Sequence, residues 1–383
     1  MSDWSAVRHI LAVRLDSMGD VLMTTPAFRA LRSGPAVERL TLLTSPAGAA
    51  IAAMVPEVDE VIVYEAPWMK AGAERGVDYD QALVERLQAA RFDAAAIFTV
   101  YSQNPWGAAL LCRMAGIPLT LAHSRERAYR LLSNEVAETE PEQGIRHEVR
   151  RHLDLVATLG WTVADERMSV QPPTEAVRRV NERLGRLDLP GRWAVLHPGS
   201  TAESRRYPFF AEVMRRLAGQ GWGFVVTGDA SERALCAEIV AESGTDAVDL
   251  SGQLDLGEMV ALVARAPMLL TNNTGPAHIA AACGTPVVDL YALTNPQHTP
   301  WAVPSRVLNH DVPCRWCYRS VCPEGHHLCL RGVAPEQVVA AALALAEEGS
   351  GTPDQVRCDA TGDMFSPKPV TPAAGPEFRF LSV

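Results

Sequence analysis

The chain has 383 residues, of which 48% are hydrophobic and 21% charged, ordinary values for a globular protein of two or three domains. These values exclude a mostly disordered chain, a collagen and a coiled coil. With 35 Lys and Arg against 45 Asp and Glu, the net charge is −10, which argues against a nucleic-acid binder and against a polybasic membrane anchor.

Apolar strands alternate with helical segments along the first half of the chain. The expected strands are 10–15, 40–44, 61–64 and 94–100, and the expected helices are 21–31, 81–90 and 148–159. This alternation is typical of a parallel sheet with helices on both faces.

The same alternation restarts after a proline-rich segment. Gln171-Pro172-Pro173-Thr174 is the predicted linker, because two prolines preclude regular structure there. The expected strands are then 193–196, 223–227, 268–271 and 286–291, and the expected helices are 177–187, 207–220, 231–243, 256–265, 275–283 and 335–348. We therefore expect an α/β protein with two doubly wound domains, 1–170 and 171–348, followed by a disordered tail, 349–383.

The first candidate site lies in the loop after the first predicted strand. Asp16-Ser17-Met18-Gly19-Asp20 closes that strand and opens a helix, and Gly19 permits the tight turn. Asp20 would face the cleft between the domains, where its carboxylate could act as general base toward an acceptor hydroxyl. The simpler interpretation is that Asp20 only caps the helix and complements its dipole. The loop is neither a Walker A loop nor a GxGxxG motif.

A second loop with phosphate-binding chemistry follows the strand at 193–196. After His197-Pro198-Gly199, the hydroxyls of Ser200 and Thr201 could donate to phosphate oxygens. Arg205 or Arg206 could place positive charge on a pyrophosphate leaving group. The alternative is a solvated arginine pair on a surface loop.

The third loop opens the helix at 275–283. Asn273, Thr274 and Gly275 leave backbone N–H groups free for an anion, and His278 falls in the first turn of the helix. His278 could equally be a partly buried, hydrogen-bonded histidine. Glu232, in another loop that follows a strand, could accept hydrogen bonds from a sugar or ribose, or simply stabilise a first helical turn.

Four of the eight cysteines crowd into one short segment. Cys314, Cys317, Cys322 and Cys329 follow a C-x2-C-x4-C-x6-C spacing. A four-thiolate metal site, disulfides and packed free thiols all remain open, and free thiols are favoured because the spacing matches no standard paired site.

Taken together, these motifs resemble those of the bacterial heptosyltransferases of glycosyltransferase family 9, over about residues 10–345. The carriers are Arg14-Leu15-Asp16-Ser17-Met18-Gly19-Asp20-Val21, His197-Pro198-Gly199-Ser200, Arg205-Arg206-Tyr207-Pro208, Asn273-Thr274-Gly275-Pro276-Ala277-His278 and the cysteine-rich stretch 313–329. The resemblance implies a GT-B fold of two facing Rossmann-like domains. It also implies inverting transfer from an ADP-heptose-type donor, without a metal or other cofactor, to a lipopolysaccharide inner-core acceptor.

The resemblance also assigns roles to particular residues. Asp20 becomes the catalytic base and Arg205 the cation facing the leaving group. The acceptor-side loop comprises Ser17, Met18 and Gly19, and the donor-binding residues are Ser200, Thr201, Arg206, Glu232, Asn273, Thr274, Gly275 and His278. Two of these depart from the family pattern: Arg205 stands where members usually have Lys, and Asn273 where they have Asp.

Other functions stay open on the sequence alone. One is a glycosyltransferase of the same fold acting on a soluble small-molecule acceptor or using another nucleotide sugar. Others are a catalytically inactive nucleotide-sugar-binding protein and a nucleotide-sugar epimerase. No apolar run approaches the ~18 residues of a membrane span, and the first residues do not form a signal peptide. We therefore expect a cytoplasmic protein with at most peripheral membrane contact. A basic patch could contribute to that contact, although a solvated helix face also explains it. The patch comprises Arg146, His147, Arg150, Arg151 and His152.

Overall fold

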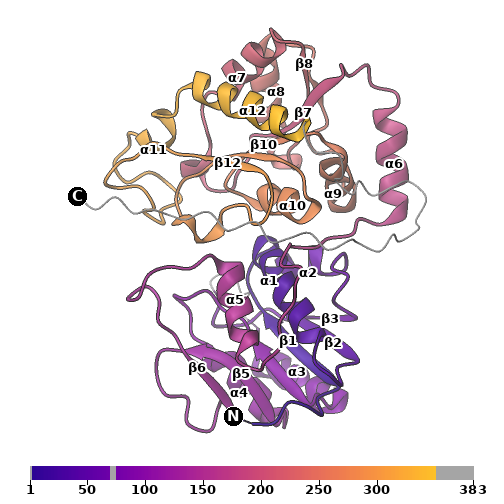
Figure 1. The fold of residues 1–383 in the computed structure, drawn as a ribbon, viewed down its shortest axis with the longest axis vertical. Coiled ribbons are helices and arrows are strands. Elements are labelled where there is room, and N and C mark those ends of the chain that lie inside the picture. The colour runs from indigo at the N-terminus through magenta and orange to yellow at the C-terminus, as the bar shows by residue number, and fades with distance from the viewer. Residues whose placement is uncertain (1, 70–74, 351–383) are drawn as a thin grey trace.

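The computed structural model describes residues 2–69 and 75–350 (Figure 1). The tail expected to be disordered lies almost entirely outside these residues. Among the described residues, no helix is long and apolar enough to cross a membrane.

Six parallel strands form the sheet of the N-terminal half. They are β1 (His9–Arg14), β2 (Arg39–Thr44), β3 (Glu60–Val63), β4 (Ala94–Ile97), β5 (Leu119–Ser124) and β6 (Asn134–Ala137), in the order β3-β2-β1-β4-β5-β6. The helices are α1 (Met18–Arg32), α2 (Pro46–Ala52), α3 (Val77–Ala90), α4 (Trp106–Met114) and α5 (Glu148–Ala157). Every residue of β4 is buried, as expected for a parallel strand covered on both faces.

The C-terminal half repeats this architecture. Its strands are β7 (Arg192–His197), β8 (Trp222–Val226), β9 (Val248–Asp249), β10 (Leu269–Asn272), β11 (Val287–Leu290) and β12 (Ser305–Leu308), in the order β12-β11-β10-β7-β8-β9. Its helices are α6 (Thr174–Leu184), α7 (Phe210–Ala218), α8 (Arg233–Ser243), α9 (Leu256–Arg265), α10 (Gly275–Cys283), α11 (Leu328–Arg331) and α12 (Pro335–Ser350). Counted from its own first strand, each sheet has the order 3-2-1-4-5-6, so each half is a Rossmann-like domain. The predicted α/β fold of two doubly wound domains is therefore confirmed.

Helix α1 begins at Met18, three residues before the predicted start, and continues through Pro26. Proline has no N–H to donate to the carbonyl of Leu22 one turn earlier. The Thr25 hydroxyl donates to that carbonyl instead, at 2.8 Å. This side-chain bond explains how a proline is tolerated inside a buried helix.

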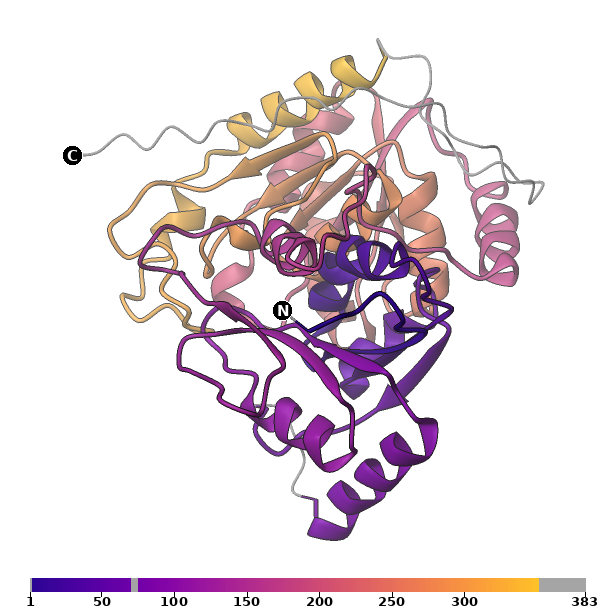
Figure 2. The ribbon, with the colours of Figure 1, turned by 60° about the horizontal axis from the view of Figure 1, so that its bottom comes forward.

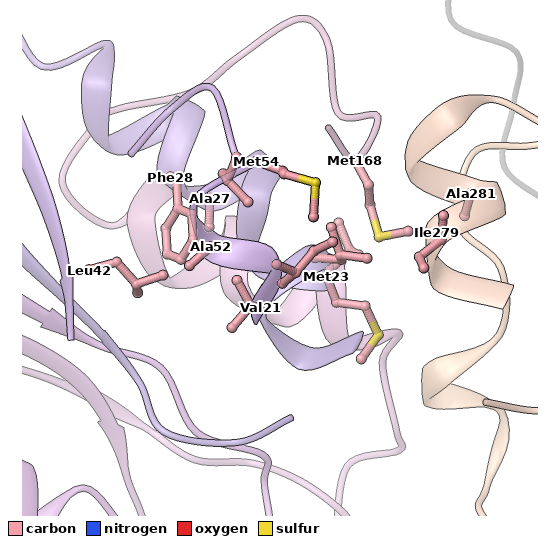
Figure 3. Packing of buried hydrophobic residues seen from close by; sticks show 14 of the residues in the cluster. Val21, Met23, Ala27, Phe28, Leu42, Ala52, Met54, Met168, Ile279 and Ala281 are labelled. Carbon is pink, nitrogen blue, oxygen red and sulfur yellow. The ribbon is translucent and has the colours of Figure 1, made fainter. Parts of the chain in front are cut away.

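An apolar contact joins the two domains. One hydrophobic cluster runs from the N-terminal core across α1 to α10 and the C-terminal core. Met23 on α1 and Met168 on the connecting segment lie next to Ile279 and Ala281 of α10 (Figure 3). In the rotated view of Figure 2, α1 and α5 lie against the C-terminal domain. The beginnings of α1 and α10, each of which follows a strand, are thereby held at the domain interface.

Candidate active site

The loops that open α1 and α10 meet at the domain interface. A Cβ atom added to Gly19 would lie 2.5 Å from Cδ2 of His278, and one added to Gly275 would meet the terminal methyl of Met18. Both glycines therefore permit close approach of the two domains. The structure brings together the predicted acceptor-side loop and part of the predicted donor loop.

These two glycines give a matched pair of predictions. The His278 ring is buried and rigid, so Gly19→Ala should lower the free energy of unfolding by ~1–3 kcal/mol through overpacking. The Met18 methyl is the far end of a flexible side chain, so Gly275→Ala should be nearly neutral. Chemical denaturation of both variants tests this, and equal losses would contradict the contact geometry.

Asp20 lies at the start of α1 as both of its predicted roles require. Its carboxylate accepts hydrogen bonds from the Ser17 N–H at 3.0 Å and the Ser17 hydroxyl at 2.6 Å, so it does cap the helix. Its other oxygen accepts from Arg14 Nη2 at 3.0 Å, and the side chain keeps 17% exposure. Burial raises the pKa of Asp20, but Arg14, His298 and Ser17 outweigh burial and hold the pKa below its usual value. Asp20 is therefore an ionised, fixed carboxylate that solvent can still reach.

Arg14 holds this carboxylate from inside the N-terminal domain. The fully buried guanidinium also pairs with Asp16 at 3.2 Å and with Glu148 at 3.3 Å. Glu148 in turn lies 3.0 Å from His152 Nε2. A buried cation needs such partners, because an unpaired charge in the interior is very costly. The network fixes the direction in which Asp20 presents its oxygens.

Arg205 approaches Asp20 from the opposite domain. It ends a short 3-10 helix, Glu203–Arg205, that follows β7. Burial lowers the pKa of Arg205, while the negative charges of Asp289 and Asp20 act in the opposite direction. Arg206 points elsewhere: it is exposed, and its Nε donates to the Ser200 carbonyl at 2.8 Å. Of the two adjacent arginines, Arg205 is the one whose charge acts on Asp20.

Asp289 lies near Arg205 and was not predicted as part of the site. It lies on β11 with no exposed surface, and neither carboxyl oxygen has a hydrogen-bond partner among the described residues. Burial raises the pKa of Asp289 to about 8, and Arg205 only partly offsets this. The carboxyl is thus largely protonated at neutral pH and does not itself neutralise the charge of Arg205.

This geometry predicts a pH-dependent stability. In the unfolded chain an aspartate loses its proton near pH ~4, whereas folded Asp289 keeps it to about pH 8. Between these values the folded state binds more protons, so the contribution of Asp289 to the free energy of unfolding falls as pH rises. Asp289→Asn has no proton to lose and should gain stability relative to the wild type from about pH 5 to 8. Denaturation across this range, with the exposed Asp246→Asn as control, would contradict the assignment if the curves ran parallel.

Two histidines complete the cluster. His278, in the first turn of α10, is buried, and burial, reinforced by His298 and Arg205, lowers its pKa to about 3. His298 lies in the 3-10 helix Pro296–His298, close enough to Asp20, Arg14 and Arg205 for their charges to act on its pKa. Burial also lowers the pKa of His298. Both rings are therefore neutral at pH 7, and Arg205 supplies positive charge from the C-terminal domain.

The remaining predicted donor residues line the loops after β7 and β8. Gly199 packs directly on the Glu232 carboxylate, which also accepts from the Asp229 N–H at 3.0 Å. Ser200 is buried and Thr201 exposed. These loops lie side by side, so their polar groups could act on one ligand.

In the third loop, the side chains of Asn272 and Asn273 both form hydrogen bonds within the protein. Asn272 donates to the Pro198 carbonyl at 2.7 Å and accepts from the Tyr207 N–H at 3.0 Å, which fixes the loop that carries Arg205. Asn273 is buried, and its amide donates to the Ala292 carbonyl at 3.0 Å and to a threonine hydroxyl. A donor contact of Asn273 stays a prediction. Thr274 is the N-cap of α10, so its N–H and that of Gly275 are among the N–H groups at the helix start that have no acceptor within the helix.

The structure contradicts the predicted basic patch for Arg151 and His152, whereas the side chains of Arg146 and Arg150 keep 32% and 38% exposure. Arg151 and His152 are buried, with Arg151 paired to Glu138. The other members also have partners: Arg146 pairs with Glu140 and Asp154, Arg150 with Glu166, and His147 contacts the Thr299 carbonyl at 2.8 Å. Helix α5 packs on α1, so its inner face is buried, and the two partly exposed arginines, Arg146 and Arg150, are both paired with carboxylates.

Four residues that support the site were not predicted from the sequence. They are Arg14, Glu148, Asp289 and His298. Arg14 and Asp289 carried a usable signal, since each is a charged residue inside an otherwise apolar strand, and a buried charge requires a partner. Glu148 and His298 carry no local signal, because only the tertiary fold brings them to Asp20.

Two facing Rossmann-like domains, with a carboxylate from one and a cation from the other at their interface, form the architecture of the GT-B fold. The comparisons with known proteins agree. Residues 81–328 match the profile of glycosyltransferase family 9 (heptosyltransferase), so the chain belongs to this family.

Relatives and solved structures cover most of the chain. Lipopolysaccharide heptosyltransferase 2 of Escherichia coli K12 is 25% identical over 356 residues, which are 88% of this chain and 99% of the relative. The crystal structure of a family 9 glycosyltransferase from Veillonella parvula superposes with a TM-score of 0.76 at 22% identity, covering 91% of this chain and 99% of that one. E. coli heptosyltransferase WaaC with ADP-2-deoxy-2-fluoro heptose gives 0.63 at 20% identity, covering 88% and 99%. The predicted family, fold and enzyme class are confirmed.

Proposed function

We propose that the protein transfers a heptose, with inversion, from an ADP-heptose-type donor to a hydroxyl of a lipopolysaccharide inner-core acceptor. The observation that carries the proposal is the placement of Asp20 and Arg205 on opposite domains, close enough for the charge of Asp20 to oppose the lowering of the Arg205 pKa by burial. A base and a cation on opposite sides of one site suit a displacement in which a hydroxyl loses its proton as a phosphate leaves.

Asp20 serves the acceptor. In a single displacement at the anomeric carbon, the Asp20 carboxylate takes the proton of the acceptor hydroxyl as the new glycosidic bond forms. Arg14 and Ser17 fix the carboxylate and keep it ionised, so it is ready to accept a proton at neutral pH.

Arg205 serves the leaving group. As the bond from the anomeric carbon to the phosphate oxygen breaks, the pyrophosphate gains negative charge. The Arg205 guanidinium and the N–H groups of Thr274 and Gly275 stabilise that charge at the start of α10. Because Asp289 is largely protonated, the full positive charge of Arg205 remains available to the phosphate.

The known relatives support this choice of substrates. The E. coli K12 relative is named a lipopolysaccharide heptosyltransferase, and the WaaC structure contains an ADP-heptose analogue. Ser200, Thr201, Arg206, Glu232 and His278 would complete the donor site. A glycolipid acceptor implies contact with the cytoplasmic face of a membrane.

Donor binding is the direct test. We expect purified protein to bind ADP-heptose at least ~10-fold more tightly than ADP-glucose, UDP-glucose or GDP-mannose, measured by calorimetry. A factor of ten corresponds to only ~1.4 kcal/mol, the scale of one or two hydrogen bonds. A preference for another nucleotide sugar would overturn the donor assignment and make Asn273 the first residue to examine.

A further inference from the structure

Four cysteines and two histidines surround one small cavity in the loop between β12 and α12. The cavity has a volume of about 20 Å³, which is room for about one water-sized particle. Its sulfur and imidazole lining comes from Cys314, Cys317, Cys322, Cys329, His326 and His327. The cavity thus gathers half of the cysteines of the chain at one point.

The segment around this cavity is irregular and partly exposed. Residues 309–327 contain no helix or strand, and Tyr318 and Val321 are 51% and 65% exposed. Trp316, Tyr318 and His327 adopt left-handed backbone angles, with φ of 65°, 56° and 51°. Such angles are costly for residues other than glycine and persist only where the surroundings enforce them.

The cysteine chemistry favours a metal. All four side chains are free thiols, and Cys314-x2-Cys317 has the spacing of a zinc knuckle. Cys314 Sγ lies 3.7 Å from His326 Nε2, so the ring can donate to a thiolate there. Four thiolates gathered around one cavity would repel one another unless a cation lay between them.

We propose that Cys314, Cys317, Cys322 and Cys329 bind one thiophilic divalent cation, such as Zn²⁺, as a structural site separate from the catalytic residues. Four thiols lose their protons to solvent as four metal–sulfur bonds form, and no electron is transferred. The described residues contain no preformed set of three metal ligands, so binding requires rotation of these side chains about the cavity.

A cation bound at this site would stabilise the positions of the catalytic loops. The hydroxyl of Ser204, next to Arg205, donates to the Arg319 carbonyl at 2.7 Å, and its N–H donates to the Ser320 carbonyl at 3.0 Å. The Tyr318 N–H donates to the Leu293 carbonyl at 2.9 Å, at the start of the loop that leads to His298. A bound cation would thereby fix two segments that approach Asp20.

Metal content of the full-length protein tests the proposal. We expect about one equivalent of zinc or iron per chain in the wild type, measured by mass spectrometry after purification without chelators. The Cys112→Ser control removes a buried thiol of the N-terminal domain and should retain the metal. Cys317→Ser and Cys329→Ser should lose it.

A second measurement uses the wild type, so that it tests the proposal even if the cysteine variants fail to fold. Stripping the wild type with a strong chelator and a thiol-reactive mercurial, then reducing it, should lower its thermal midpoint and expose four thiols to alkylation. Added Zn²⁺ should restore both. His326→Ala should bind Zn²⁺ about 10- to 100-fold more weakly. Wild type that is already metal-free as purified, with the four thiols open to alkylation or joined in two disulfides, would overturn the proposal, and neither result depends on the sugar transferred.

Discussion

Asp20→Asn is expected to reduce turnover at least ~100-fold while leaving donor affinity nearly unchanged. General-base catalysis contributes ~100- to 10,000-fold, and an amide cannot take the acceptor proton. Asn can still accept the Ser17 N–H bond that caps α1, so helix stability is largely retained. Single-turnover kinetics with saturating donor, together with calorimetric donor binding, measure the two effects separately.

The control for this variant is Asp255→Asn. Asp255 belongs to a capping box at the start of α9, where it is the N-cap residue and accepts the Glu258 N–H at 2.7 Å, and it lies away from the catalytic residues. It should therefore keep both the cap of α9 and full turnover, because Asn caps a helix about as well as Asp. Equal turnover in Asp20→Asn and wild type would leave Asp20 with its capping role alone.

Arg205→Ala is expected to lower turnover by ~100- to 1,000-fold, the range for removing one preorganised group that stabilises transition-state charge. Arg205→Lys should recover part of the rate, because it keeps the charge but loses the planar guanidinium. Steady-state kinetics should place most of the loss in kcat, since the leaving group gains its charge during bond cleavage.

Two other arginines make this test specific. Arg206→Ala should chiefly raise KM for the donor, because Arg206 is exposed and its contact is with the Ser200 carbonyl. Arg215→Ala, on the exposed face of α7, should change neither constant. A large kcat loss in Arg206→Ala with little change in Arg205→Ala would show that the roles of the two arginines are reversed.

The sequence predicted the loops after strands well because of a general property of parallel sheets. Ligands bind at the carboxyl ends of the strands, so polar residues directly after an apolar run are candidates wherever they occur. Asp20, Arg205 and His278 were found in this way, and the structure brings all three to the domain interface. Their distance from one another could not be read from the chain, because it depends on how the two domains pack.

The sequence explains why some strands were not predicted. Strand β5 contains Thr120, His123 and Ser124, which are buried but polar, so no apolar run marks it. Strand β12 is an edge strand and only half-buried. The error over Arg151 has the opposite cause. A run of basic residues in and just before one helix suggests a surface, but Arg151 lies on the buried face and pairs there with Glu138.

The methionine-rich contact between α1 and α10 has a consequence for temperature. Separating the two domains would expose Met23, Met168 and Ile279 to water, so apolar burial favours the closed form by ~25 cal/mol for each Å² covered. This driving force is largely entropic near room temperature and weakens on cooling. Closure should therefore carry a negative heat-capacity change, and the population of separated domains should rise in the cold.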